Sequence, residues 1–262
     1  MRPRRFLVTR LGDDSIVIEA GEAAHAERVL RMRAGDAVVV FDGTGAEVDG
    51  RIERVDRGRL IVRPTGPIRL ADDGWAGLTL AVAAPKGERA DWMIEKCAEL
   101  GVAAIRLIVT ERGAVTPGAG KLERWRRKAI EAAKQAGLSR VMAVDGPMPI
   151  GEAADSRWLL LLGDPSPAAE SFVDRLEGLR AGEAHAARVQ VMVYIGPEGG
   201  FTEAESAELA SLGAIGVRLA PSILRIETAA VATAAVFAGV MRDDGAWPRG
   251  SIHMRTQEEH AD

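Results

Sequence analysis

Short apolar segments separated by glycine-containing turns dominate the first 70 residues of the chain. Residues 38–43 (VVVFDG) predict a strand that runs into a turn, and residues 47–55 and 59–64 predict two further strands at short intervals. One helix is expected around residues 23–31, because a Gly-Asp turn follows that segment. Closely spaced strands with glycine turns are typical of a small β-barrel, which is therefore predicted for residues 1–70.

Strands and helices alternate in residues 71–262, beyond a linker rich in Pro, Gly and Asp at 64–77. Continuous apolar runs indicate strands buried on both faces, as in a parallel sheet. Such strands are predicted at 78–84, 104–109, 158–162, 189–195 and 216–220. Helices are predicted at 89–100, 122–136, 203–212 and 227–241. This alternation predicts an α/β fold.

A glycine-rich loop lies between a buried strand and a helix in the segment YIGPEGGF, residues 194–201. Thr202 and Glu205 then form the pattern of a capping box at the start of that helix. Ligands of open α/β sheets bind beyond the carboxyl ends of the strands, where glycines allow the backbone to approach them closely. The spacing matches neither the dinucleotide motif nor a P-loop. We therefore interpret this segment as a ligand-binding loop of another class.

A second strand-to-helix loop, residues 219–230 (LAPSILRIETAA), carries Arg225 just before a predicted helix N-terminus. A cation at this position opposes the helix dipole. We therefore expect a compensating contact with Glu198, with Glu227 or with an anionic substrate. Both a structural salt bridge and a direct catalytic role are consistent with this placement.

Positive charge is concentrated locally, although the formal net charge is −4. Residues 121–140 hold 7 Lys/Arg against 2 Asp/Glu. Lys86, Arg89 and Arg112 follow predicted strands on the same side as the glycine loop, where clustered cations suit a phosphate backbone. Each of these side chains could equally be an ordinary surface charge, so charge alone leaves a nucleic-acid partner open.

Several classes of protein are excluded by what the sequence lacks. Cys97 is the single cysteine, which excludes a disulfide framework and an all-cysteine metal site. The four histidines are scattered, so no metal is expected. No apolar run is long enough to cross a membrane, and the basic N-terminus lacks the apolar stretch of a signal peptide. A soluble cytoplasmic protein is therefore expected.

Taken together, the motifs resemble the 16S ribosomal RNA uracil-N3 methyltransferase family of the knotted SPOUT methyltransferases. The resemblance runs from Phe6 to about Val240. It rests on VLRMRAGDAVVVFDGTG (29–45), KGERADWMIEKCAELGV (86–102), TERG (110–113), IGPEGGFTEAE (195–205) and LAPSILRIETAA (219–230). It implies a PUA-like RNA-binding β-barrel over residues 1–70 and a SPOUT methyltransferase domain with a C-terminal trefoil knot over 71–262. Knots are rare exceptions to ordinary topology, and the apolar pattern alone does not predict one.

The resemblance also implies an activity. A homodimer would methylate uracil N3 in the 16S rRNA of the small ribosomal subunit, with S-adenosylmethionine as cofactor. The helix predicted at 227–241 could contribute to the dimer interface or pack only within its own chain. Three loops would hold the cofactor, through Leu162, Gly163, Ile195, Gly196, Pro197, Glu198, Gly199, Gly200, Leu219, Ala220, Ile223 and Leu224.

Charged residues receive roles in this hypothesis. Arg225 is the candidate for stabilising negative charge on the uracil oxygens. Glu198 or Glu227 would orient Arg225 or accept the N3 proton. Phosphates of the RNA would be held by six basic residues, namely Arg4, Arg5, Arg28, Arg31, Lys86 and Arg112.

The chain departs from the family pattern at several positions. Leu138 stands where the family has an arginine, for which Arg140 could substitute. Ala220 and Ser222 replace the usual Gly and Arg, and Gly113 follows TER in place of Ser or Cys. Two alternatives therefore stay open: a SPOUT methyltransferase with a different RNA target, and an RNA-binding protein with impaired methyl transfer.

Overall fold

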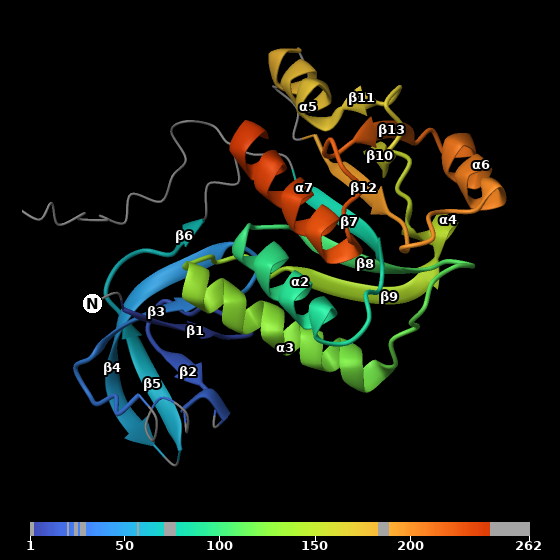
Figure 1. The fold of residues 1–262 in the computed structure, drawn as a ribbon. Helices are drawn as coiled ribbons and strands as arrows, with labels where there is room; N and C mark the ends of the chain where they lie inside the picture. The colour runs from blue at the N-terminus through green and yellow to red at the C-terminus, as the bar shows by residue number, and fades with distance from the viewer. Residues whose placement is uncertain are drawn as a thin grey trace, which may run out of the picture.

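Two β-sheets, each with its own core, make up the structure (Figure 1). The computed structural model describes residues 3–19, 21–23, 26, 30–56, 58–70, 77–182 and 189–241. Most of the helix predicted at 23–31 and part of the linker predicted at 64–77 lie outside the described residues. No helix in the described ranges is both long and apolar enough to cross a membrane.

The N-terminal sheet has six strands and curls around an apolar core. The strand order is β1-β3-β4-β5-β2, and β6 pairs with β4; β1 and β3 are parallel and the other pairs antiparallel. The strands are β1 Arg4–Leu7, β2 Ile16–Ile18, β3 Ala37–Phe41, β4 Ala46–Asp56, β5 Arg59–Pro64 and β6 Arg69–Leu70. Apolar side chains such as Phe6, Val40 and Leu60 fill the core. This curled sheet is the predicted small barrel, left open between β1 and β2.

The C-terminal sheet has seven strands, all parallel, in the order β11-β13-β10-β12-β7-β8-β9. Its strands are β7 Leu78–Ala83, β8 Ala104–Val109, β9 Ala143–Pro149, β10 Leu159–Gly163, β11 Glu170–Ser171, β12 Val191–Ile195 and β13 Ile215–Arg218. From β7 the chain builds outward through β8 and β9. It then continues on the other side of β7, where β12 lies between β10 and β7. This reversal is the topological switch point at which open α/β sheets bind ligands.

Helices cover both faces of the parallel sheet (Figure 1). One face carries α2 Glu88–Glu99, α3 Ala119–Ala136, α5 Phe172–Ala181 and α7 Ile226–Met241. The other face carries α4 Ile150–Ala153 and α6 Glu203–Ser211. Strand side chains alternate between the two cores: Leu80 and Val193 face the first group, and Ala81 and Tyr194 the second. The α/β fold predicted from the apolar runs is confirmed, whereas the trefoil knot stays a prediction.

Candidate cofactor-binding site

A cavity of about 570 Å³ opens at the carboxyl ends of β10, β12 and β13, at the switch point of the sheet. The three predicted loops come together there, and all twelve residues predicted to hold the cofactor are among those that line it. The volume lies within the roughly 300–1,000 Å³ typical of small-molecule sites. Four lining residues lie outside the three loops predicted from the sequence, 162–165, 195–200 and 219–224: Phe201, Ser206, Ile226 and Ala229. Phe201 and Ile226 follow the predicted loops within two residues, whereas Ser206 and Ala229 lie further along the two helices that follow, so the start of each helix is the signal that could have identified them.

Two glycines of the central loop lie where a side chain would collide with a neighbour. A Cβ atom on Gly196 would come within 2.9 Å of the Phe201 ring, and one on Gly199 within 3.3 Å of Arg112 Cδ. The loop therefore packs tightly against its surroundings at both positions. This packing explains why the sequence is rich in glycine here, independently of any ligand.

The capping box predicted at the start of α6 is present, and it also ties the glycine loop to the loop after β8. Glu205 N donates to Thr202 Oγ1 at 3.2 Å, and Thr202 N donates to Glu205 Oε2 at 2.8 Å. The second carboxylate oxygen of Glu205 accepts from Glu111 N at 2.7 Å. One carboxylate thus joins the TERG segment to the helix that follows the cavity.

Arg112 holds the glycine loop directly. Its Nη1 donates to Gly199 O at 2.8 Å, and its side chain crosses the face of Gly199. The sequence assigned Arg112 to RNA phosphate, but the structure gives its guanidinium a protein partner. Lys86, from the same prediction, is exposed just beyond β7 and has no ion pair within the described residues.

Arg89, at the start of α2, lies between the two candidate catalytic carboxylates. Its Nη1 is 3.7 Å from Glu198 Oε1 and 3.6 Å from Glu227 Oε1. Glu198 lines the cavity and is half-exposed, whereas Glu227 is buried and its Oε2 has no hydrogen-bond partner in the described structure. Arg225 is exposed and forms no ion pair with either carboxylate. The contact expected from Arg225 is therefore made by Arg89, whose role as a bridge the sequence did not reveal.

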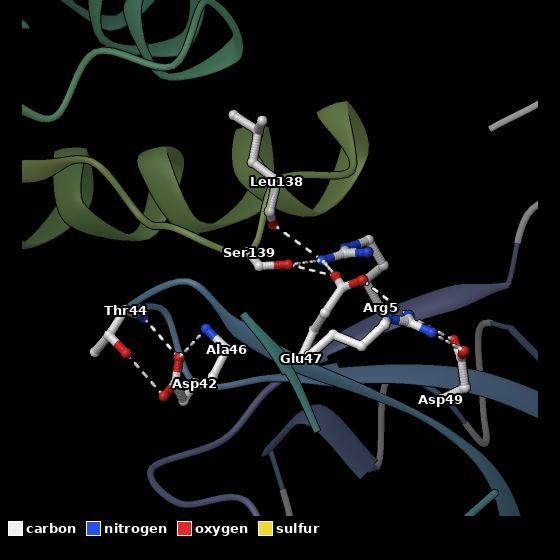
Figure 2. Close-up of polar contacts among 9 residues, drawn as sticks. Arg5, Asp42, Thr44, Ala46, Glu47, Asp49, Leu138 and Ser139 are labelled. Carbon is white, nitrogen blue, oxygen red and sulfur yellow. Dashed lines mark hydrogen bonds and ion pairs between the residues drawn. The ribbon is translucent and has the colours of Figure 1, made fainter. Parts of the chain in front are cut away.

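The basic residues predicted on the N-terminal sheet divide into two groups. Arg4 and Arg31 are exposed. Arg5 is only 12% exposed, and its guanidinium is bonded to Glu47, Ser139 and the Leu138 carbonyl (Figure 2). The contact of Arg5 with RNA phosphate stays a prediction, and in this structure its side chain has three protein acceptors. Arg28 lies outside the described residues.

Comparison with known proteins identifies the family of the chain. An RNA methyltransferase domain family matches residues 75–238, and an RNA methyltransferase PUA domain family matches residues 18–65. The ribosomal RNA small subunit methyltransferase E of Mycobacterium tuberculosis is 33% identical over 247 residues, covering 86% of this chain and 87% of that protein. The chain belongs to the ribosomal RNA small subunit methyltransferase E family. The resemblance on which the sequence prediction rested is thereby confirmed.

Solved structures support the same membership in this methyltransferase E family. The methyltransferase E of Neisseria gonorrhoeae, bound to S-adenosyl methionine, matches with a TM-score of 0.78 and 26% identity. A putative methyltransferase of Legionella pneumophila, in complex with the same cofactor, matches with a TM-score of 0.77 and 27% identity. Each match covers 91% of this chain and 98% of the other. The similarity therefore extends over both sheets, not only over the cofactor domain.

Proposed function

We propose that this protein transfers a methyl group from S-adenosylmethionine to N3 of a uracil in the 16S rRNA of the small ribosomal subunit. The observation that carries the proposal is the cavity formed by three strand-end loops at the switch point, in a chain of the methyltransferase E family. The two solved relatives with closely similar folds both hold this cofactor.

The lining residues fit such a cofactor. Leu162, Ile195 and Leu219 provide apolar walls for a flat base, and the glycine loop leaves room for close approach of the backbone. Asp164 and Glu198 place negative charge in the cavity, which suits a ligand that carries a sulfonium and an ammonium group. When bound, S-adenosylmethionine supplies an activated methyl group on its sulfur. Within the described residues no group of three metal-ligating side chains forms, and the proposed reaction needs no metal.

The reaction requires the protein to expose and deprotonate uracil N3. This atom lies on the Watson–Crick edge, so the base must be unpaired before it can enter the cavity. We assign proton acceptance to Glu198, because it lines the cavity and is half-exposed. Arg225, exposed on the loop before α7, is assigned to the charge that develops on the uracil oxygens. Glu227 is buried and keeps Arg89 beside Glu198, so its proposed role is to fix that arrangement.

RNA phosphates are assigned to exposed cations. Arg4, Arg31 and Lys86 retain the role predicted from the sequence, and Arg28 stays a prediction. Replacing one of the exposed residues by alanine should weaken binding of all RNA sequences similarly and reduce the salt dependence by about one counterion.

The homodimer is likewise proposed. Its expected interface helix α7 also packs within the chain, against α2, α5 and β7. We expect the enzyme to act on small subunits in the cytoplasm.

The proposal is tested with purified protein, radiolabelled S-adenosylmethionine and small subunits from a strain lacking the enzyme. Nuclease digestion and nucleoside chromatography should place the label in 3-methyluridine, and large subunits serve as the control. Label in another nucleoside would indicate a different RNA target. If calorimetry shows cofactor binding but no label appears, methyl transfer is impaired, and Leu138→Arg becomes the first reversion to examine.

The roles proposed for Arg225 and Glu198 predict that kcat falls when either residue is replaced. Arg225→Ala should lower kcat about 10²- to 10³-fold, as removal of a transition-state donor does, with cofactor affinity unchanged. Glu198→Gln should lower kcat about 10²- to 10⁴-fold through loss of the base. Activity of the glutamine variant close to that of the parent would remove Glu198 from proton transfer.

A further inference from the structure

The two sheets are joined by a polar cluster, here called the domain clamp, formed by Arg5, Glu47, Leu138 and Ser139 (Figure 2). Arg5 Nη2 donates to Glu47 Oε2 at 2.8 Å, to Ser139 Oγ at 2.7 Å and to Leu138 O at 3.2 Å. The Ser139 hydroxyl donates in turn to Glu47. Arg5 and Glu47 belong to the N-terminal sheet, whereas Leu138 and Ser139 belong to the connection between α3 and β9.

Backbone hydrogen bonds also join the N-terminal sheet to the α3–β9 connection beside the domain clamp. Gly45 N donates to Ser139 O at 3.1 Å, and Val141 N donates to Gly43 O at 2.9 Å. Gly43 has φ of +80°, and a Cβ there would lie 3.1 Å from Leu7 Cδ1 and 3.4 Å from Val141 Cγ2. A larger residue at position 43 would be strained both by the positive φ and by the close contacts of its Cβ atom. The GTG of the first family motif therefore has a structural purpose, which is to admit the α3–β9 connection against the N-terminal sheet.

The domain clamp is largely buried, and it contains an ion pair between Arg5 and Glu47. The side chains of Arg5 and Glu47 are only 12% and 20% exposed, and the guanidinium lies 5.1 Å from the centre of the Phe41 ring. Partial burial alone would raise the pKa of Glu47, but hydrogen bonds from Ser139, Arg5 and Arg69 outweigh it and lower the pKa to about 2. Charge-assisted hydrogen bonds of this kind are stronger than neutral ones and fix direction as well as distance.

Helix α3 connects the clamp to the cofactor loop. It contains 18 residues and is therefore about 27 Å long. Its C-terminal end meets the N-terminal sheet, and its N-terminal end lies on the far side of the molecule (Figure 1). The chain reaches that far end from Glu111 and Arg112, which bond to Glu205 and to Gly199. Helix α3 and the segment 113–118 thus lie between the clamp and the wall of the cavity.

We propose that the domain clamp positions the RNA substrate by fixing the N-terminal sheet at a set orientation to the cofactor cavity. This inference rests on the proposed function. An RNA held by exposed cations of both domains brings its uracil to the cavity only when their relative placement is correct. Misplacement by about 1 Å can cost roughly 10²-fold in rate. Arg5 and Ser139 are accordingly positioning residues that act through domain orientation and do not contact RNA.

Arg5→Met and Arg69→Met form a matched pair for the test. Both arginines bond to Glu47, but Arg69 otherwise pairs with Asp49 and contacts nothing in the methyltransferase domain within the described residues. In the full chain, Arg5→Met should lower kcat/KM for small subunits about 10- to 100-fold and leave cofactor affinity by calorimetry unchanged. Arg69→Met should stay within about 3-fold of the parent. Arg5→Lys should restore part of the loss, since its ammonium can still donate to Glu47.

Distance measurement separates failure of the clamp from failure of the proposed function. Spin labels at Thr65→Cys and Ser211→Cys report on the two domains, because both positions are exposed and Cys97 is buried. Arg5→Met should broaden the distribution of distances between the labels, and Arg69→Met should not. This readout is independent of methylation, so it tests the clamp even if the parent protein methylates no small subunit.

Three results would overturn the inference. The first is that Arg5→Met has the same kcat/KM and the same distribution of label distances as the parent, although its melting temperature is lower. The second is an equal loss in both methionine variants, which would reflect stability of the sheet. The third is a loss accompanied by a flatter salt dependence of RNA binding, which would make Arg5 a phosphate contact. If Arg5→Met does not fold, Ser139→Ala removes one partner without removing charge and must show the same pattern.

Discussion

Glu47→Gln offers a quantitative test of the electrostatics at the domain clamp. In the folded protein the carboxylate accepts hydrogen bonds from Ser139, Arg5 and Arg69. Burial by itself would raise its pKa, but these three bonds lower it from 4.5 to about 2. Glutamine has nearly the same shape and cannot ionise, so the substitution removes the charge with little change in packing.

The magnitude follows from the pKa difference between the folded and unfolded states. At 1.36 kcal/mol per pKa unit, a fall from 4.5 to about 2 corresponds to at most ~3.4 kcal/mol. The side chain is still partly exposed, and solvent screening reduces this to roughly 1–2 kcal/mol. Because the folded pKa is depressed, the contribution is fully present above pH 4.5. It is lost as the pH falls towards 2, and more than half of it is gone at about pH 3.

Urea denaturation of the parent and Glu47→Gln at pH 7 and pH 3 measures this contribution. The parent should be more stable by about 1–2 kcal/mol at pH 7, and the difference should shrink by more than half at pH 3. Glu53→Gln is the control, because among the described residues Glu53 pairs only with Arg54 and Arg63 at the surface, and the substitution should change the free energy of unfolding by less than about 1 kcal/mol. A difference that stays constant between the two pH values would refute the reasoning.

Three further substitutions test the region around the cavity. Gly196→Ala should weaken cofactor binding by about 10-fold in calorimetry, since its Cβ would lie 2.9 Å from the Phe201 ring; parental affinity would show that the ring moves aside without cost. Thr202→Ala should lower the free energy of unfolding by about 1 kcal/mol in guanidinium titration, because the bond from Glu205 N is lost. Tyr194→Phe should leave stability unchanged or higher, because the buried hydroxyl of Tyr194 has no hydrogen-bond partner in the described structure. A loss above 1 kcal/mol would reveal one.

The central strands could be predicted because burial on both faces leaves an uninterrupted apolar run. Strands β7 and β12 are buried at every position, and they lie at Leu78–Ala83 and Val191–Ile195, within the predicted ranges 78–84 and 189–195. The cavity could be anticipated for a related reason, since parallel strands bring their carboxyl ends to one edge and the loops that follow must meet there. The capping box at Thr202 could be predicted from the local sequence alone, because its partner Glu205 is three residues away.

Elements at the margins could not be predicted in the same way. Strand β9 has the sequence AVDGPMP and lies at the edge of its sheet, where half-exposure removes the apolar signal. Helix α5 carries an internal glycine, and only Phe172 and Leu176 of its residues are buried. The contacts of the clamp that join the two sheets link positions more than 90 residues apart, so no local pattern reports them. The sequence grouped Arg89 with Lys86 and Arg112 as cations that suit a phosphate backbone or an ordinary surface, because its carboxylate partners are distant in the sequence.

The structure resolves the basic residues into two functional kinds that the sequence could not separate. Arg5, Arg89 and Arg112 each join elements distant in the chain, in each case through one terminal nitrogen of the guanidinium. Arg4 and Lys86 are exposed and have no ion pair within the described residues. RNA contacts should therefore be sought among such exposed cations, because an arginine already committed to the fold would have to break protein bonds before it could bind a phosphate.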